Sequence, residues 1–110
     1  MSYQKVILIG NACKDPELRY VEKRAIATFS LATDETFANP SGGEPIKRVE
    51  FHRIVMWDAQ AEFAEKYIRK GSKLFIEGRL RTRTWEDRST IKHTVTEIVT
   101  DKLELLSRPS

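Results

Sequence analysis

The chain has 110 residues and a mass of 12.7 kDa, which is room for one domain around one hydrophobic core. Its longest apolar run, Val6 to Ile9, is far shorter than the about 20 residues that a membrane-spanning helix needs. No basic segment followed by an apolar stretch opens the sequence, so we expect no secretory signal and a cytoplasmic location.

Few residues could hold a metal ion or form a disulfide. Cys13 is the only cysteine, so it has no internal partner. One thiol and two scattered histidines lack the spacing of a metal site, and we expect neither a metal nor a cofactor. The formal net charge of +3 is unevenly distributed, because residues 69–92 hold eight basic and three acidic residues. An anionic ligand responds to that local surplus of charge.

The first half of the chain predicts three strands. Residues 5–10 form a short run rich in β-branched side chains, which predicts the first strand. The turn-forming residues 11–16 predict a break or bulge after it. Residues 25–33 alternate between apolar and polar side chains, as a half-buried strand does. Residues 37–45 hold two prolines and a Gly-Gly pair, which favour a mobile loop. Residues 49–57 are rich in Val, Ile and aromatic side chains and predict the third strand.

The second half predicts one helix and two strands. A helix is expected over residues 59–69, with Asp58 as its N-cap and Gly71 as its C′ residue. Residues 73–85 predict a long strand with a sharp bend at Gly78, and residues 92–103 a last strand after a turn. We expect one domain over residues 1–110, with residues 106–110 as a short disordered tail. This order predicts an all-β, five-stranded OB-fold Greek-key barrel with one α-helix between strands 3 and 4.

The fourth predicted strand has a cationic face. Alternation places Arg79, Arg81, Arg83 and Trp85 on one side of it. Charges on an exposed strand can simply protect it against edge pairing. A solvated face gains nothing from an exposed indole, however, whereas stacking of a nucleobase on an aromatic ring is worth about 1 to 3 kcal/mol. The pattern favours a face that binds nucleic acid.

The third predicted strand repeats this pattern, with Phe51, Arg53 and Trp57 on one side. The alternative is that both aromatic residues lie in the core, which is the commonest position of such side chains. An unpaired guanidinium suits a dry core poorly, whereas it suits phosphate contact and base stacking. Phe37, in the Gly- and Pro-rich loop, has few neighbours that could bury it, so we expect it to close over a bound strand.

Seven stretches of the chain resemble the bacterial-type single-stranded DNA-binding proteins, in the family's order and over nearly the whole length. These are KVILIGN at 5–11, DPELRY at 15–20, FSLAT at 29–33, EFHRIV at 50–55, AEFAEKYIRKG at 61–71, FIEGRLRTRTW at 75–85 and TEIV at 96–99. The resemblance implies an OB barrel, a homotetramer and single-stranded DNA as the ligand, bound without strong sequence preference. It also implies a nucleoid-associated protein that protects exposed strands in replication, recombination and repair.

By the same resemblance, the functional residues fall into three groups. The stacking aromatics are Phe37, Phe51, Trp57 and Trp85. The phosphate contacts are Lys5, Arg53, Lys70, Lys73, Arg81 and Arg83. His52 matches a position at the family's subunit interface.

Some positions depart from the family's pattern. Phe37 and Phe51 stand where tryptophan is common, and Trp57 where phenylalanine is common. Asp58 and Cys13 each replace a usual glycine, and the segment after Asp58 lacks a lysine often found there. The family usually continues into a flexible linker and an acidic tip that recruits replication and repair proteins, whereas this sequence ends at Ser110.

Other classes of function remain as alternatives. A metal-dependent nuclease could use Asp34 and Glu35, with His52 or His93 as the base. Adjacent residues of a strand point to opposite faces, so these carboxylates would not converge on one ion, and we expect no enzymatic activity. An OB module that docks proteins is a second alternative, against which the four aromatic positions argue. Stacking surfaces do not read the 2′-OH, so the residues alone do not separate DNA from RNA.

Overall fold

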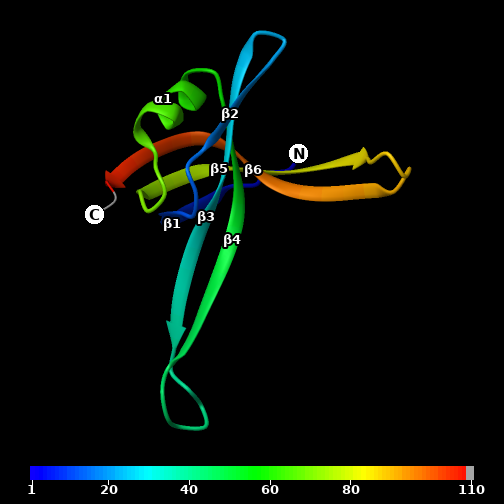
Figure 1. Cartoon of the computed structure of the whole chain (residues 1–110). Helices are drawn as coiled ribbons and strands as arrows, with labels where there is room; N and C mark the ends of the chain where they lie inside the picture. The colour runs from blue at the N-terminus through cyan, green and yellow to red at the C-terminus, as the bar shows by residue number, and fades with distance from the viewer. Residues whose placement is uncertain (109–110) are drawn as a thin grey trace.

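The computed structural model describes residues 1–108 as a closed five-stranded barrel with one short helix (Figure 1). Its elements are β1 (Val6–Ala12), β2 (Glu17–Val21), β3 (Arg24–Phe37), β4 (Ile46–Trp57), α1 (Ala59–Tyr67), β5 (Lys73–Glu86) and β6 (Lys92–Ser107). The strand order is β1-β5-β6-β4-β3-β2, and a further pairing of β1 with β3 closes the barrel. The predicted all-β OB-fold, with its helix before the fourth barrel strand, is confirmed.

Inward side chains of the barrel strands make the core. Alternate residues of each strand point inward, and α1 packs against β3 and β4 with one small-residue stripe. The residues with no exposed surface include Leu31, Ile54, Met56, Ala61, Ala64, Leu74 and Ile76. Within residues 1–108, no helix has the length and apolarity that crossing a membrane requires.

Two glycines lie where neighbouring strands approach each other most closely. A Cβ atom on Gly10 would collide with the carbonyl oxygen of Ala32, and one on Gly78 with that of Val99. At Gly78 the pairing with β6 also shifts register, which leaves Asp101 as an extra residue on β6. Gly78 therefore permits the close crossing of β5 and β6 beside this bulge, and the sharp bend expected there stays a prediction.

Two hairpins extend well beyond the barrel, as Figure 1 shows. Strands β3 and β4 pair continuously from Ile26 opposite Trp57 to Phe37 opposite Ile46. Strands β5 and β6 pair as far as Glu86 opposite Lys92. We call residues 33–50 the β3–β4 arm and residues 82–96 the β5–β6 arm. Both arms carry side chains that the barrel cannot bury, so they offer exposed surface on either side of the strands.

Helix α1 begins at Ala59 with Asp58 at its N-cap position, as predicted, but its other end differs from the prediction. The carboxylate of Asp58 makes no capping hydrogen bond to the helix. The helix ends at Tyr67 rather than at residue 69, because Ile68 turns into the core and adopts an extended conformation. Gly71 is therefore not the C′ residue, and its φ of 94° belongs to the turn that leads into β5.

The structure contains one strand more than the sequence predicts, and several strands are longer than predicted. Residues 17–21 form β2, an unpredicted strand that hydrogen-bonds only to β3 and has little apolar alternation of its own. Strand β6 continues to Ser107, which pairs with Lys73, so the predicted tail is wrong for Leu106 and Ser107. Residues 109 and 110 of that tail lie outside the described residues.

Candidate functional site

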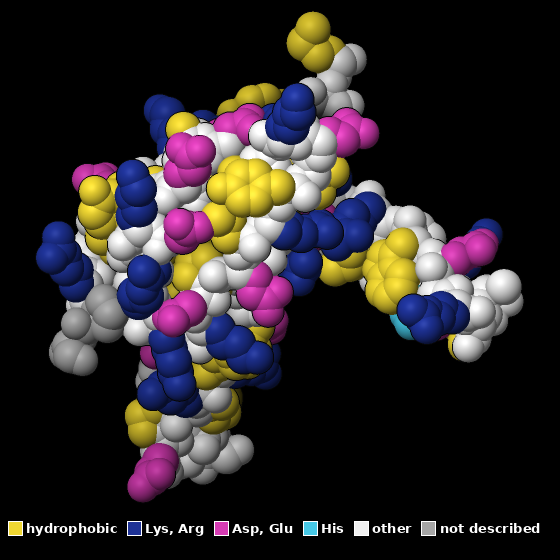
Figure 2. All heavy atoms as spheres, turned by 45° about the horizontal axis from the view of Figure 1, so that its top comes forward, with side chains coloured by type: hydrophobic (Ala, Val, Ile, Leu, Met, Phe, Trp, Pro, Cys, Tyr) yellow, Lys and Arg dark blue, Asp and Glu magenta, His cyan; other side chains and the backbone are white. Residues whose placement is uncertain are grey.

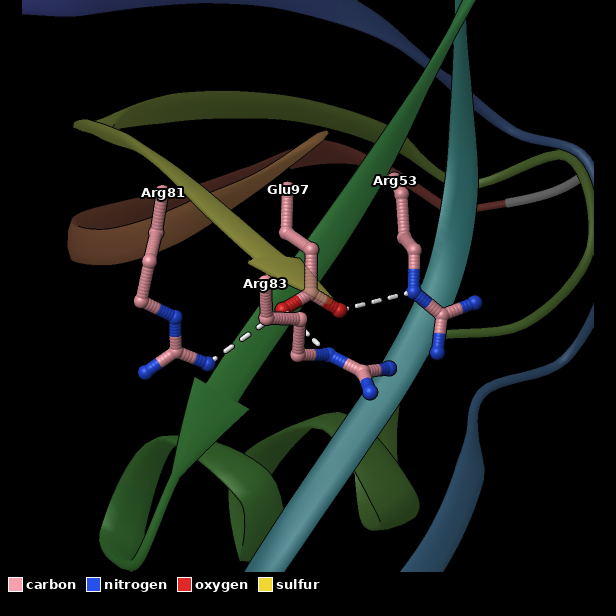
Figure 3. A network of polar contacts seen from close by, with 4 residues as sticks. All are labelled: Arg53, Arg81, Arg83 and Glu97. Atoms are coloured by element: carbon pink, nitrogen blue, oxygen red, sulfur yellow. Dashed lines mark hydrogen bonds and ion pairs between the residues drawn. The ribbon is translucent and has the colours of Figure 1, made fainter. Parts of the chain in front are cut away.

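Three arginines from two strands converge on one carboxylate (Figure 3). Arg81 on β5 lies directly opposite Glu97 on β6, and Arg83 lies two residues further along β5. Strand β4, which carries Arg53, is the other neighbour of β6 and pairs with it at Ile54 and Val55. Alternation along β4, β5 and β6 then places all four side chains on the outer face of the barrel. The structure thus brings together three of the predicted phosphate contacts.

Glu97 is the buried centre of this group. Its Oε2 accepts a hydrogen bond of 2.8 Å from Nε of Arg53. Its Oε1 accepts bonds of 3.0 Å from Nε of Arg83 and 3.3 Å from Arg81. The carboxylate side chain is 2% exposed, whereas the three arginine side chains are 39 to 46% exposed. Arg53 is consequently not the unpaired guanidinium that the sequence suggests, although its outer surface remains open.

The charge balance of this cluster is positive. Burial by itself would raise the pKa of Glu97, but the hydrogen bonds from Arg53, Arg83 and Arg81 outweigh burial and hold that pKa below its ordinary value of 4.5. Glu97 is therefore ionised at neutral pH. One carboxylate neutralises one of three guanidinium groups, so two positive charges remain to attract an anion. We call Arg53, Arg81, Arg83 and Glu97 the arginine cluster.

Trp85 lies beside the arginine cluster on the β5–β6 arm. Its indole is 46% exposed and stacks on the imidazole of His93, with ring centroids 4.4 Å apart. Nε2 of His93 lies 2.8 Å from Oδ2 of Asp87, at the end of the arm. A hollow of about 380 Å³ is lined by Trp85, His93 and Val95 together with Arg53 and Arg83. One face of the indole is occupied by His93, which holds the ring in place beside the cationic groups.

Phe51 and Trp57 lie on β4 on either side of Arg53. Phe51 is 67% exposed, so it is not a core residue. Trp57 is half-buried, and the guanidinium of Arg24 lies over its ring at 4.5 Å from the centroid. The alternation predicted for this strand is confirmed, because Phe51, Arg53 and Trp57 share the outer face. Figure 2 shows Lys and Arg side chains gathered where one arm leaves the barrel, with hydrophobic side chains on both sides of them.

Phe37 and His52 lie elsewhere. Their positions in the continuous β3–β4 register place both on the opposite side of the ribbon from Phe51. Phe37, at the end of β3, is 43% exposed, and the guanidinium of Arg48 lies 5.7 Å from its ring centroid. Nε2 of His52 lies 2.9 Å from the hydroxyl oxygen of Thr33. The structure thus keeps Phe37 apart from the other three aromatic residues, at the far end of the β3–β4 arm.

The three predicted lysine contacts lie outside the arginine cluster. Lys5 precedes β1 and forms an ion pair of 3.5 Å with Glu77. Lys70 lies in the turn after α1, and Lys73 begins β5. Ten residues of β5 separate Lys73 from Arg83, roughly 33 Å along an extended strand. A ligand that touches all of these cations must follow the barrel surface over a long path.

Four residues of this surface are not predicted as binding residues from the sequence: Glu97, His93, Arg24 and Asp58. Glu97 carried a signal, since it is the one acidic residue in the otherwise uncharged run from His93 to Thr100. His93 was considered only as a catalytic base. Arg24 and its partner Asp58 carried no local signal, because 33 residues separate Arg24 from the ring beneath it. Among residues 1–108, no group of three or more His, Cys, Asp or Glu side chains could hold a metal ion.

Comparison with known proteins gives concordant matches. The single-strand binding protein family matches residues 3–106. A single-stranded DNA-binding protein of Bacteroides thetaiotaomicron is 44% identical over 109 residues, covering 97% of this chain and 68% of that protein. The structure of the Plasmodium falciparum SSB complex with ssDNA superposes with a TM-score of 0.87 and 31% identity, covering 97% of both chains.

The arginine cluster predicts the effect of removing its carboxylate. Glu97→Gln should lower the free energy of unfolding at pH 7 by about 1 to 3 kcal/mol, since it removes charged hydrogen bonds and leaves three arginines to repel one another. Because the folded-state pKa of Glu97 is below 4.5, its contribution is complete above that pH and is lost as the pH falls through the folded value. Urea titrations at pH 7 and from pH 5 to 3 should show the wild type and variant converging at low pH.

The matched control is Glu50→Gln, which removes an exposed carboxylate on β4, the strand that carries Arg53. It should change stability by less than about 0.5 kcal/mol. Equal stability of the wild type and Glu97→Gln at pH 7 would show that the carboxylate does not organise the cluster.

Proposed function

This chain belongs to the single-strand binding protein family, and we propose that the outer face of its barrel binds single-stranded DNA by base stacking and phosphate contact. The observation that carries this proposal is the arginine cluster with Trp85 and Phe51 on either side of it. The relatives described above are named for single-stranded DNA, and one of them was solved in complex with it. The chain therefore acts as a single-stranded DNA-binding protein.

We infer that the binding residues divide by the contact they make. Phe51, Trp57 and Trp85 supply stacking surfaces on the barrel and the β5–β6 arm, and Phe37 supplies one at the end of the β3–β4 arm. Stacking on such rings tolerates any base, and cationic side chains track the phosphates between them. The contacts to phosphate are assigned to Lys5, Arg53, Lys70, Lys73, Arg81 and Arg83. Their spread around the barrel supports a wrapped strand rather than a short bound segment.

We propose that the protein protects exposed strands in replication, recombination and repair, and that it does so without catalysis, in the cytoplasm at the nucleoid. The support is that the family and the relatives are named for binding. The exposed aromatic rings also suit unpaired bases, because the bases of a duplex are stacked on one another and not free to stack on protein.

The first test of function is binding to poly(dT) and to duplex of matched length at several salt concentrations. Single strands should bind more tightly than duplex. The logarithm of the binding constant should fall with the logarithm of salt concentration by about 0.7 for each phosphate neutralised. Fluorescence anisotropy of a labelled oligonucleotide measures both. Equal affinity for duplex, or no salt dependence, would contradict the proposed site.

The second test concerns Trp85. Because the ring is 46% exposed, Trp85→Ala should leave the thermal midpoint nearly unchanged. Loss of one stacked base, at about 1 to 3 kcal/mol, corresponds to roughly 5- to 150-fold weaker binding of poly(dT). Thermal melts and binding titrations of the same variant separate the two effects. Unchanged affinity in a folded variant would exclude Trp85 as a stacking residue.

We propose that the chain assembles as a homotetramer. Strand β1 supports this, since its first residues hydrogen-bond to β5 on one side and meet no second strand until Asn11. Ile7 and Ile9 on this strand are 57% and 54% exposed. An apolar, unpaired strand edge is a natural site for another copy. Following the family resemblance, we assign His52 to a subunit interface; replication and repair proteins are proposed as further partners.

The assembly is tested by light scattering at micromolar concentration. The wild type should show four times the 12.7 kDa mass of the chain. Ile9→Lys should shift the population toward smaller species, because it places a charge on the apolar strand edge, whereas Lys23→Gly on the distant β2–β3 turn should not. A monomeric wild type would rule the tetramer out.

A further inference from the structure

Arg24 is held over Trp57 by a second residue, Asp58. Nε of Arg24 donates to Oδ1 of Asp58 at 3.2 Å, and a terminal nitrogen donates to Oδ2 at 2.6 Å. The guanidinium lies 4.5 Å from the centroid of the Trp57 ring. The hydrogen bond from Arg24 lowers the pKa of Asp58 below its ordinary value, so the pair is ionised at neutral pH. Asp58 thus holds one edge of the guanidinium, and the ring of Trp57 lies next to the guanidinium.

The backbone conformation of Asp58 is unusual for a residue that has a side chain. Asp58 has φ of 55° and ψ of −122°, a conformation that favours glycine. An aspartate is strained there, and its carboxylate makes no cap to the helix that follows. The side chain instead makes only the two bonds to Arg24 among those described. Asp58 therefore serves to position Arg24.

Arg24 changes what Trp57 can offer to a ligand. The indole is half-buried, and the guanidinium lies over its ring at 4.5 Å from the centroid. The Arg24 side chain is itself 56% exposed, so part of it is accessible to a ligand. A base that approaches this part of the barrel therefore has the guanidinium of Arg24 within reach as well as the indole. Guanidinium planes stack on bases much as aromatic rings do.

We propose that Arg24 adds a guanidinium to the base-stacking surface of Trp57 at this end of β4, with Trp57 as its support and Asp58 as its positioning residue. This inference rests on the proposed function, since it names a further residue of the same DNA-binding face. Because the charge of Arg24 is already paired with Asp58, its contact is to a base and adds no counterion release. Arg24 therefore differs from Arg53, Arg81 and Arg83, whose cluster retains excess positive charge.

The test compares Arg24→Ala and Arg24→Lys in the full chain, with labelled oligo(dT) over a range of salt concentrations. Both variants should bind at least about fivefold more weakly, because neither keeps a planar group over the ring. The slope of affinity against salt should match the wild type for Arg24→Ala. A slope reduced by about 0.7, or full affinity in Arg24→Lys, would show a phosphate contact and overturn the proposal.

A double-mutant cycle tests the role of the indole. The loss caused by Arg24→Ala should shrink in a Trp57→Ala background and persist in a Trp85→Ala background, since only Trp57 lies beneath Arg24. Equal losses in both backgrounds would contradict the proposed support. Circular dichroism of each variant establishes that it is folded.

The matched control is Lys23→Gly, which removes the neighbouring cation at a residue whose φ of 71° suits glycine. It should weaken binding less than twofold. Tighter binding by Arg24→Ala would mean that Arg24 is a cover displaced by DNA, and unchanged binding would mean that it is a bystander. Either result overturns the inference while leaving the proposed function intact, whereas failure of the wild type to bind oligo(dT) would overturn the proposed function itself.

Discussion

The proposed binding surface depends on the hydrogen bonds that the buried carboxylate of Glu97 accepts from three arginines. Three guanidinium groups from β4 and β5 would repel one another on a bare surface, and long arginine side chains would lose much rotamer freedom if they were held in place. One central anion at 2% exposure aligns them and still leaves a positive excess. The same residue ties β6 to both of its neighbours, β5 and β4. One residue therefore links the strands that carry the cationic face and orders the arginines on it.

The curvature of the barrel sets how the other groups are distributed around that centre. Gly10 and Gly78 permit close strand crossings that any side chain would obstruct, and the extra residue at Asp101 adds to the bend. Past the crossings, β3 with β4 and β5 with β6 leave the barrel as two arms (Figure 1). Aromatic residues on separate arms face different directions, which suits a flexible polymer that follows a surface better than a compact ligand.

Two of the aromatic rings are in contact with another side chain, and the kind of contact differs between them. Trp85 stacks on His93, which is in turn bonded to Asp87, so one side of the indole is fixed and the other is open. The guanidinium of Arg24, which Asp58 holds, lies over the ring of Trp57. Phe51, by contrast, is simply exposed. Rings that look equivalent as sequence positions therefore differ in what they present to a base.

The sequence by itself determined the alternation of side chains, the order of the barrel strands and helix, the start of α1, and the shared face of Arg53 with Phe51 and of Arg81 with Trp85. It could not determine where α1 ends, the extra strand β2 or the partners of Glu97 and Arg24. Alternation is a local property with a period of two residues, whereas Arg53 and Glu97 are 44 residues apart. Which strands become neighbours is decided by closure of the barrel through backbone hydrogen bonds, so only the tertiary structure brought these side chains together.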